Sequence, residues 1–251
     1  MTGSSYGNQY TISKQGEYDA ITGKTWNGLI KNYQFVISQI SRRVRWQGTM
    51  DFAVDVVTGV SPRGLLPSMA WQFAYNDSGE WVHSASTEQE TGFDLNGLEP
   101  DLGFYINLAS DGSISNYGQR VWIDPRPTEK SFKKKPSKAH DLASIIMHET
   151  IHAMGVAYDT EGDGFANEFK KHTAYKGGKP FFIGDNAVGI YGGDVPISDL
   201  SNSSTHDHVK VVNKKKNLIT VMADAGSYDI SWRTPTELDF AILKDIGWNV
   251  V

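Results

Sequence analysis

The first long pattern in the sequence is a helical one. Between residues 27 and 44, apolar side chains recur every three or four positions, which places them on one face of a helix. They are Ile30, Tyr33, Ile37, Ile40 and Val44. The residues before this segment, 1–26, are mostly polar. We expect them to form an extended lead-in outside the main body of the protein.

Segments that alternate in hydrophobicity or are rich in β-branched and aromatic residues follow, and they predict strands. They cover residues 50–57 (MDFAVDVV), 68–75 (SMAWQFAY), 104–109 (FYINLA) and, as a short strand, 121–124 (VWID). The stretch 128–138 contains a run of lysines. It predicts a charged, solvated loop, to which we assign no function.

A second helix is predicted immediately after that loop. Asp141 is a suitable N-cap, and Gly155 is a suitable end because glycine adopts a left-handed backbone conformation at little cost. The apolar flanks of this helix are Leu142, Ile145, Met147, Ile151 and Met154. Residues 160–217 are rich in Gly, Asp, Ser and Lys and predict irregular structure with short strands.

The last predicted helix runs from Pro235 to Ile246. Thr234 is expected as its N-cap, with Pro235 in the first helical position and Glu237 completing a capping box. Gly247 is expected to end it. Its apolar face, Leu238, Ala241, Ile242 and Ile246, is predicted to pack against the body of the protein.

Composition narrows the class of protein. With 251 residues and 39% hydrophobic content the chain can bury a substantial core, and a net charge of −5 argues against nucleic acid or an anionic membrane as the main partner. There is no cysteine, so disulfides and thiolate metal sites are excluded. No apolar run approaches the ~18 residues of a transmembrane helix, and residues 1–19 have no signal-peptide pattern.

The helix predicted after Asp141 carries the sequence HETIH at residues 148–152. Two histidines at positions i and i+4 lie one turn apart on the same helix face, so His148 and His152 can bind one zinc ion. Glu149, beside the first histidine, is then placed to act as general base towards water. An amphipathic helix with two surface histidines is the alternative, and the otherwise apolar helix disfavours it.

HETIHAMG, at residues 148–155, resembles the HExxHxxG motif of the metzincin metallopeptidases. The usual third histidine of that motif is replaced by Tyr158. The branch of the family that includes leishmanolysin instead takes its third histidine from far downstream, shortly before a methionine-containing turn. The chain resembles that branch: STHDHVKVVNKKKNLITVM contains His206 and His208 upstream of Met222.

The resemblance implies His148, His152 and His208 as zinc ligands, with His206 as the alternative third ligand. Met222 would form the apolar floor of the site without binding the metal. The implied fold is α+β and metzincin-like, with an N-terminal twisted mixed sheet, an active-site helix and an irregular C-terminal subdomain that ends in a helix. We expect residues 27–251 to form a single catalytic domain with its cleft near residue 155.

Other third ligands are open at this point. Glu161 or Glu168 would serve in a site of the gluzincin type, Asp159 is one position late, and Tyr158 is a weak ligand that more commonly packs beneath such a site. The remaining histidines, His83, His140 and His172, are isolated in the sequence.

Two further features are weaker. Tyr228 stands where some metzincins have a tyrosine that binds the tetrahedral intermediate, although the spacing from the methionine is longer here. DTEGDG, at residues 159–164, resembles the start of a calcium loop, so Ca2+ is a candidate second metal. Lys170 occupies the position of the closing glutamate, and this favours an ordinary acidic turn.

The resemblance implies a zinc-dependent endopeptidase in which zinc-activated water attacks the peptide bond and Glu149 carries the proton. The strand predicted at Phe104–Ala109 is our candidate edge for pairing with an extended peptide. The alternatives are a catalytically weak or inactive peptidase-like binding or adhesive module, and a zinc hydrolase acting on a non-peptide amide. We expect a monomer that acts on proteins or peptides and is secreted from a bacterium.

Overall fold

The structure, a computed structural model, describes most of the 251-residue chain. The described residues are 1–16, 23–58, 68–71, 73–75, 81–92, 97, 99–108, 115–116, 119–156, 168–197, 212–213, 218–222 and 233–251. In this part of the chain the fold is a mixed α/β structure with six α-helices and a mixed central sheet.

Five strands form the central sheet in the order β1-β2-β4-β8-β5. Their bounds are Thr2–Ser5 (β1), Asn8–Gly16 (β2), Thr49–Thr58 (β4), Ser68–Trp71 (β5) and Leu102–Leu108 (β8). The strands β2, β4 and β8 run parallel, whereas β1 and β5 are antiparallel to their neighbours β2 and β8. The two sheet edges among the described residues are therefore both antiparallel strands.

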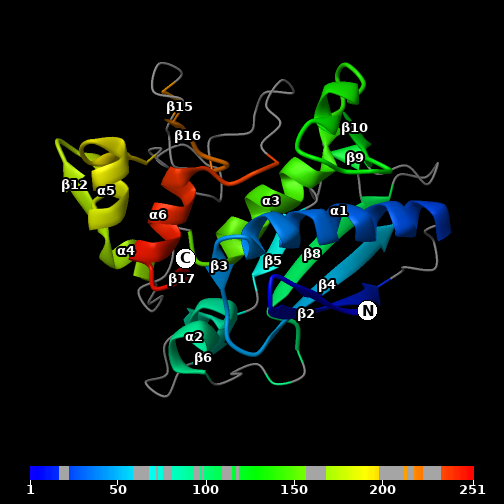
Figure 1. The fold of residues 1–251 in the computed structure, drawn as a ribbon, viewed down its shortest axis with the longest axis horizontal. Helices are drawn as coiled ribbons and strands as arrows, with labels where there is room; N and C mark the ends of the chain where they lie inside the picture. The colour runs from blue at the N-terminus through cyan, green and yellow to red at the C-terminus, as the bar shows by residue number, and fades with distance from the viewer. Residues whose placement is uncertain are drawn as a thin grey trace.

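One face of this sheet is apolar and is covered by the helix α1 (Gly23–Ser41), as Figure 1 shows. Alternate residues of the three parallel strands are buried on it, because successive side chains of a strand point to opposite faces. They are Tyr10, Ile12, Met50, Phe52, Val54, Val56, Leu102, Phe104 and Ile106. Tyr33 of α1 contacts Phe104 edge-on at a ring-centroid distance of 5.4 Å and Phe52 at 6.5 Å.

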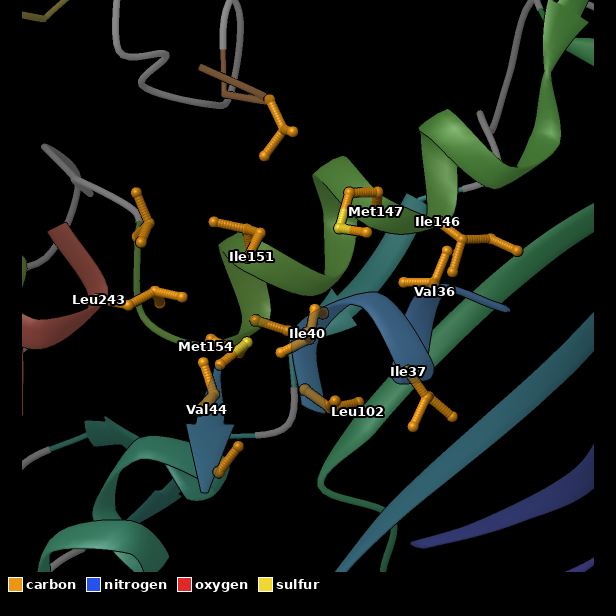
Figure 2. Close-up of a cluster of buried hydrophobic side chains, with 14 of the residues drawn as sticks. Val36, Ile37, Ile40, Val44, Leu102, Ile146, Met147, Ile151, Met154 and Leu243 are labelled. Carbon is orange, nitrogen blue, oxygen red and sulfur yellow. The ribbon is translucent and has the colours of Figure 1, made fainter. Parts of the chain in front are cut away.

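The helix α3 (Leu142–Ala153) lies beside α1 and carries the predicted metal site. Figure 2 shows the packing between them: Val36 and Ile40 of α1 lie next to the apolar side of α3, whereas Ile37 points away from α3 toward the sheet. The side chains that α3 contributes are Ile146, Met147, Ile151 and, just beyond the helix, Met154, all of which are fully buried. The helix that carries the HETIH motif is thus part of the core.

The C-terminal part of the chain lies on the other side of α3 from the central sheet (Figure 1). It contains the helices α4 (Glu168–Lys171), α5 (Asp185–Tyr191) and α6 (Glu237–Asp245). A three-stranded sheet is formed by β12 (Thr173–Lys176), β13 (Lys179–Phe182) and β14 (Val195–Pro196). The helix α6 packs against α5, and residues 238–243 of α6 are all buried.

Short elements complete the described structure. Three strand pairs are β3 (Val44–Arg45) with β17 (Asn249–Val250), β6 (Phe73–Tyr75) with β7 (Trp81–His83), and β15 (Val212–Asn213) with β16 (Leu218–Ile219). A three-stranded sheet consists of β9 (Ser115–Asn116), β10 (Gln119–Trp122) and β11 (His140–Asp141). The remaining elements are the helix α2 (Ser84–Thr91) and a 3-10 turn (Ser131–Lys134). None of the described helices is long and apolar enough to cross a membrane.

The structure confirms most of the predicted elements. The strand at 50–57, the motif helix with its Asp141 cap and the buried face of the last helix are all present. The first helix is present as Gly23–Ser41, whereas Val44, which was predicted on its apolar face, belongs to the strand β3. The region 160–217 is more regular than predicted, since its described residues include the helices α4 and α5.

Four predictions need correction. Residues 2–16, expected as a lead-in, form β1 and β2 of the central sheet, because Tyr10 and Ile12 alternate with polar residues and bury one face. The predicted strand 68–75 is divided, with β5 in the central sheet and β6 paired with β7. Residues 104–108 belong to β8, which lies between β4 and β5, so this strand is not a sheet edge.

The fourth correction concerns the start of the last helix. Its N-cap is Thr236 and not Thr234, and the capping box is completed by Asp239 and not Glu237. The buried Asp239 carboxylate accepts hydrogen bonds from both the backbone N–H of Thr236 (2.7 Å) and its hydroxyl (2.8 Å). Glu237 instead faces solvent and forms an ion pair with Arg43 at 2.5 Å.

Candidate metal centre

The motif helix α3 has a well-defined start and end. At its start the Asp141 carboxylate accepts hydrogen bonds from the backbone N–H (3.1 Å) and the hydroxyl (2.6 Å) of Ser144. At its end Gly155 has φ of +98°, a conformation that L-residues rarely adopt. The N–H of Gly155 donates to the carbonyl of His152 at 2.8 Å, and the N–H of Val156 donates to the carbonyl of Ile151 at 3.3 Å. This is the Schellman pattern of a helix end.

The turn at Gly155 also orients one of the predicted ligands. It brings the Val156 carbonyl back towards the helix, where the oxygen lies 2.8 Å from Nδ1 of His152. His152 is fully buried. Because a carbonyl oxygen only accepts hydrogen bonds, this contact requires the proton on Nδ1, and in a neutral ring Nε2 is then unprotonated.

His148 is held in the same way by a different part of the chain. Its Nδ1 lies 2.7 Å from the backbone carbonyl of Val221, which is 73 residues away in the sequence. His148 is 8% exposed. By the same reasoning its Nδ1 donates to the Val221 carbonyl, and in a neutral ring its Nε2 is unprotonated.

The Nε2 atoms of His148 and His152 face each other, 3.1 Å apart. Two unprotonated imidazole nitrogens repel at this separation, and a cation between them would remove the repulsion. For a zinc ion bound at about 2.0–2.1 Å with tetrahedral angles, the two ligand nitrogens are about 3.3 Å apart. The histidine pair thus fits two positions of one zinc ion, and both Nδ1 contacts are the carbonyl partners that metal-binding histidines commonly have.

Glu149 lies in the same turn and is also nearly buried, with 8% of its surface exposed. Its negative charge acts on Tyr33 in the core. Burial raises the pKa of Tyr33 well above its usual value, and the charge of Glu149 raises it further. The Tyr33 hydroxyl is itself buried and has no hydrogen-bond partner within the described part of the chain. The Glu149 carboxylate therefore lies close enough to Tyr33 to act on it electrostatically.

The segment that holds His148 is itself anchored by the last helix. Asp239 of α6 accepts a hydrogen bond from the Val221 N–H at 3.1 Å and one from the Thr220 hydroxyl. The Thr220 hydroxyl oxygen in turn accepts from the Met222 N–H at 2.9 Å. Met222 is fully buried and directly follows the residue that contacts His148. Burial raises the pKa of Asp239, and these hydrogen bonds oppose the rise.

The sequence reasoning missed Val221, Asp239 and Val156. Two of them act through backbone carbonyls, which leave no residue-type signal. Asp239 had a signal in the spacing TELD at residues 236–239, which is a capping box read two positions later than we predicted.

Several predicted site residues lie outside the described residues: Tyr158, Asp159, Glu161, His206, His208 and Tyr228. The calcium-like segment 159–164 lies there too. Glu168 begins α4 and forms an exposed ion pair with Lys171 at 2.5 Å. His172 lies against the ring of Phe182, and His140 is half-buried in β11. Within the described ranges, no group of three or more His, Cys, Asp or Glu side chains is placed to bind a metal.

Comparisons with known proteins add no relationship. No family of known proteins, no curated protein and no solved structure matches this chain.

The Gly155 turn provides a prediction. Replacing Gly155 with Ala forces an L-residue into a left-handed conformation, at a cost of about 1–2 kcal/mol. We expect lower thermal stability and, because the turn positions the Val156 carbonyl for His152, weaker zinc binding. Space is not limiting, since the nearest atom to an added Cβ is 3.6 Å away. Gly177→Ala, at a left-handed glycine of the β12–β13 hairpin, is the control. It should lower stability without changing zinc affinity, and equal zinc affinity in both variants would contradict the assigned role.

Proposed function

We propose that this protein is a zinc-dependent endopeptidase of the metzincin type, with His148 and His152 as zinc ligands and Glu149 as general base. The observation that carries the proposal is the pair of Nε2 atoms 3.1 Å apart, each ring being held through Nδ1 by a backbone carbonyl. Zinc bound there would supply a Lewis acid that polarises the scissile carbonyl and lowers the pKa of a bound water towards neutrality.

The chain's own groups supply the proton transfers. Glu149 accepts the proton of the attacking water and then delivers it to the nitrogen of the leaving amine. The Val156 and Val221 carbonyls fix the ring orientation of the two histidines, so that both Nε2 atoms remain unprotonated and converge. The buried Met222 supports the segment that carries Val221, without contributing a ligand.

An extended peptide would pair with the edge strand β5 (Ser68–Trp71). This replaces our prediction for Phe104–Ala109, because residues 104–108 belong to β8, inside the sheet. The strand β5 is antiparallel to β8, forms an edge of the described sheet and contacts α3. Backbone pairing at such an edge provides affinity with little dependence on the side chains of the substrate.

The test of the proposal combines metal analysis with an activity assay. The purified protein should bind one zinc ion per chain and cleave an unfolded protein, and a chelator should abolish both properties. His152→Ala should lose zinc and activity together. Zinc binding without any cleavage would instead favour the peptidase-like binding module.

We propose His208 as the third ligand, on the basis of its place before Met222. Zinc with only two protein ligands is weakly held, whereas three leave one position open for water. His208→Ala is expected to lower zinc content sharply, His206→Ala much less, and Tyr158→Phe not at all, as measured by metal analysis after dialysis. The opposite result for the two histidines would make His206 the ligand. Zinc retained in both would direct attention to Asp159 and Glu161.

A further inference from the structure

Arg233 is a buried charged residue that the proposed chemistry does not use. It lies just before α6 and is 3% exposed. Its Nε and Nη2 donate to the two oxygens of Asp141 at 2.8 and 2.5 Å, which is the bidentate geometry of a strong arginine–carboxylate pair. Its Nη1 donates to Asp124 at 2.8 Å and also to the Thr128 carbonyl and the Ser131 hydroxyl. Each nitrogen of the guanidinium thus donates to a partner inside the protein.

The first of these partners is the N-cap of the metal-binding helix. Asp141 uses the same carboxylate to hold Ser144 in the first turn of α3. Arg233 therefore binds the start of α3 through the group that determines where the helix begins. Burial alone would raise the pKa of Asp124, but hydrogen bonds from Ser131, the Arg126 N–H and Arg233 outweigh it, and the net pKa is lowered. The Asp124 carboxylate is thus available as an anion for its pair with Arg233.

The stretch that contains Arg233 meets α3 at a second point. Val221 binds the ring of His148, and Val221 is tied to the same stretch because Asp239 accepts its N–H. The hydrogen bond between Val221 and Asp239 thus joins the two ends of a segment that contains Arg233. This segment contacts α3 at residue 141 and at residue 148, which are about 10 Å apart along a helix.

We infer that Arg233 is a positioning residue for the metal centre. By fixing the C-terminal stretch against the N-cap of α3, it sets the register between His148 and the Val221 carbonyl. The inference concerns zinc affinity and so rests on the proposed function, but the underlying hydrogen bond between His148 and Val221 can be tested in the metal-free protein.

The test uses Arg233→Lys, which keeps the charge and removes the bidentate fork. We expect zinc affinity, measured by competition with a chelator, to fall about tenfold, the lower end of the effect of groups that orient metal ligands. In the metal-free protein, the Nδ1 proton of His148 should exchange with solvent faster, as measured by NMR. The double variant Arg233→Gln/Asp124→Asn removes one cation and one anion together, and it should show the same two changes if Arg233→Lys fails to fold.

A control separates positioning from general stability. Ile12→Ala truncates a fully buried side chain in β2 of the central sheet. In this sheet β4 and β8 separate β2 from β5, the strand that contacts α3. The substitution should lower the melting temperature but leave zinc affinity and the His148 proton unchanged. Wild-type zinc affinity and proton exchange in both Arg233 variants would overturn the inference while leaving the zinc site intact. If the wild-type protein binds no zinc, the proposed function fails, and the proton exchange of His148 alone decides whether Arg233 positions that ring.

Discussion

Glu149→Gln should retain bound zinc and lose turnover on an unfolded protein substrate by about 10²- to 10⁴-fold, the range that general acid–base catalysis contributes. The amide has nearly the same size and shape as the carboxylate, so the nearly buried position is filled as before. It cannot accept and return a proton at neutral pH. The two histidines and their carbonyl partners are untouched, and this is why metal content and activity should separate.

The matched control is Glu168→Gln, at the glutamate that the sequence offered as an alternative ligand. Its carboxylate is paired with Lys171 on the surface, so the change should affect neither zinc content nor turnover. The measurements are zinc per chain after dialysis and the initial rate of cleavage at saturating substrate. Activity of Glu149→Gln at the wild-type level would refute the role of Glu149, and loss of zinc from it would mean that Glu149 contributes to metal binding.

Sequence periodicity predicted the parts of the fold in which one face of an element is buried. The helix at 27–44, the strand at 50–57 and the helix after Asp141 all follow this rule. The same rule indicates a strand in residues 2–16, because Tyr10 and Ile12 alternate with polar neighbours. The high polarity of the surrounding residues led us to predict a lead-in instead. The order of the strands could not be predicted from the hydrophobic pattern, because the pattern of residues 104–108 is the same for a strand at the edge of a sheet and for one inside it.

The candidate site shows a similar division. The spacing of His148 and His152 on one helix face was sufficient to predict that their rings would converge, and the 3.1 Å between their Nε2 atoms agrees with it. The contacts that orient the two histidine rings come from the backbone carbonyls of Val156 and Val221. Any residue type has such a carbonyl, so only the fold can identify them. Arg233 had no sequence signal either, since its partners lie 92 and 109 residues away.

Leu238→Asp should destabilise the protein by several kcal/mol, since it replaces a fully buried apolar side chain with a carboxyl group in the core. Leu238 lies in α6, whose residues 238–243 are buried between α5 and the body of the protein, so the group cannot reach solvent by a small movement. Part of the loss is the removed apolar contact, and the rest is the cost of an unpaired buried charge.

These two contributions can be distinguished by pH. Burial raises the pKa of the introduced carboxyl in the folded state above its value in the unfolded chain. The folded variant therefore binds more protons, and its stability is highest below the unfolded pKa and falls as pH rises through the folded one. Relative to wild type, the melting temperature of Leu238→Asp should be lowered less at pH 4 than at pH 8. Leu238→Ala, which has only the loss of contacts, should show the same deficit at both.

Lys244→Asp introduces the same group on the exposed side of the same helix and is the second control. It should cost no more than about 1 kcal/mol, through an unfavourable charge near the helix C-terminus. An unchanged melting temperature in Leu238→Asp would show that α6 is peripheral. That result would also remove the basis for assigning to Asp239, the next residue in the helix, its role in holding Val221 against His148.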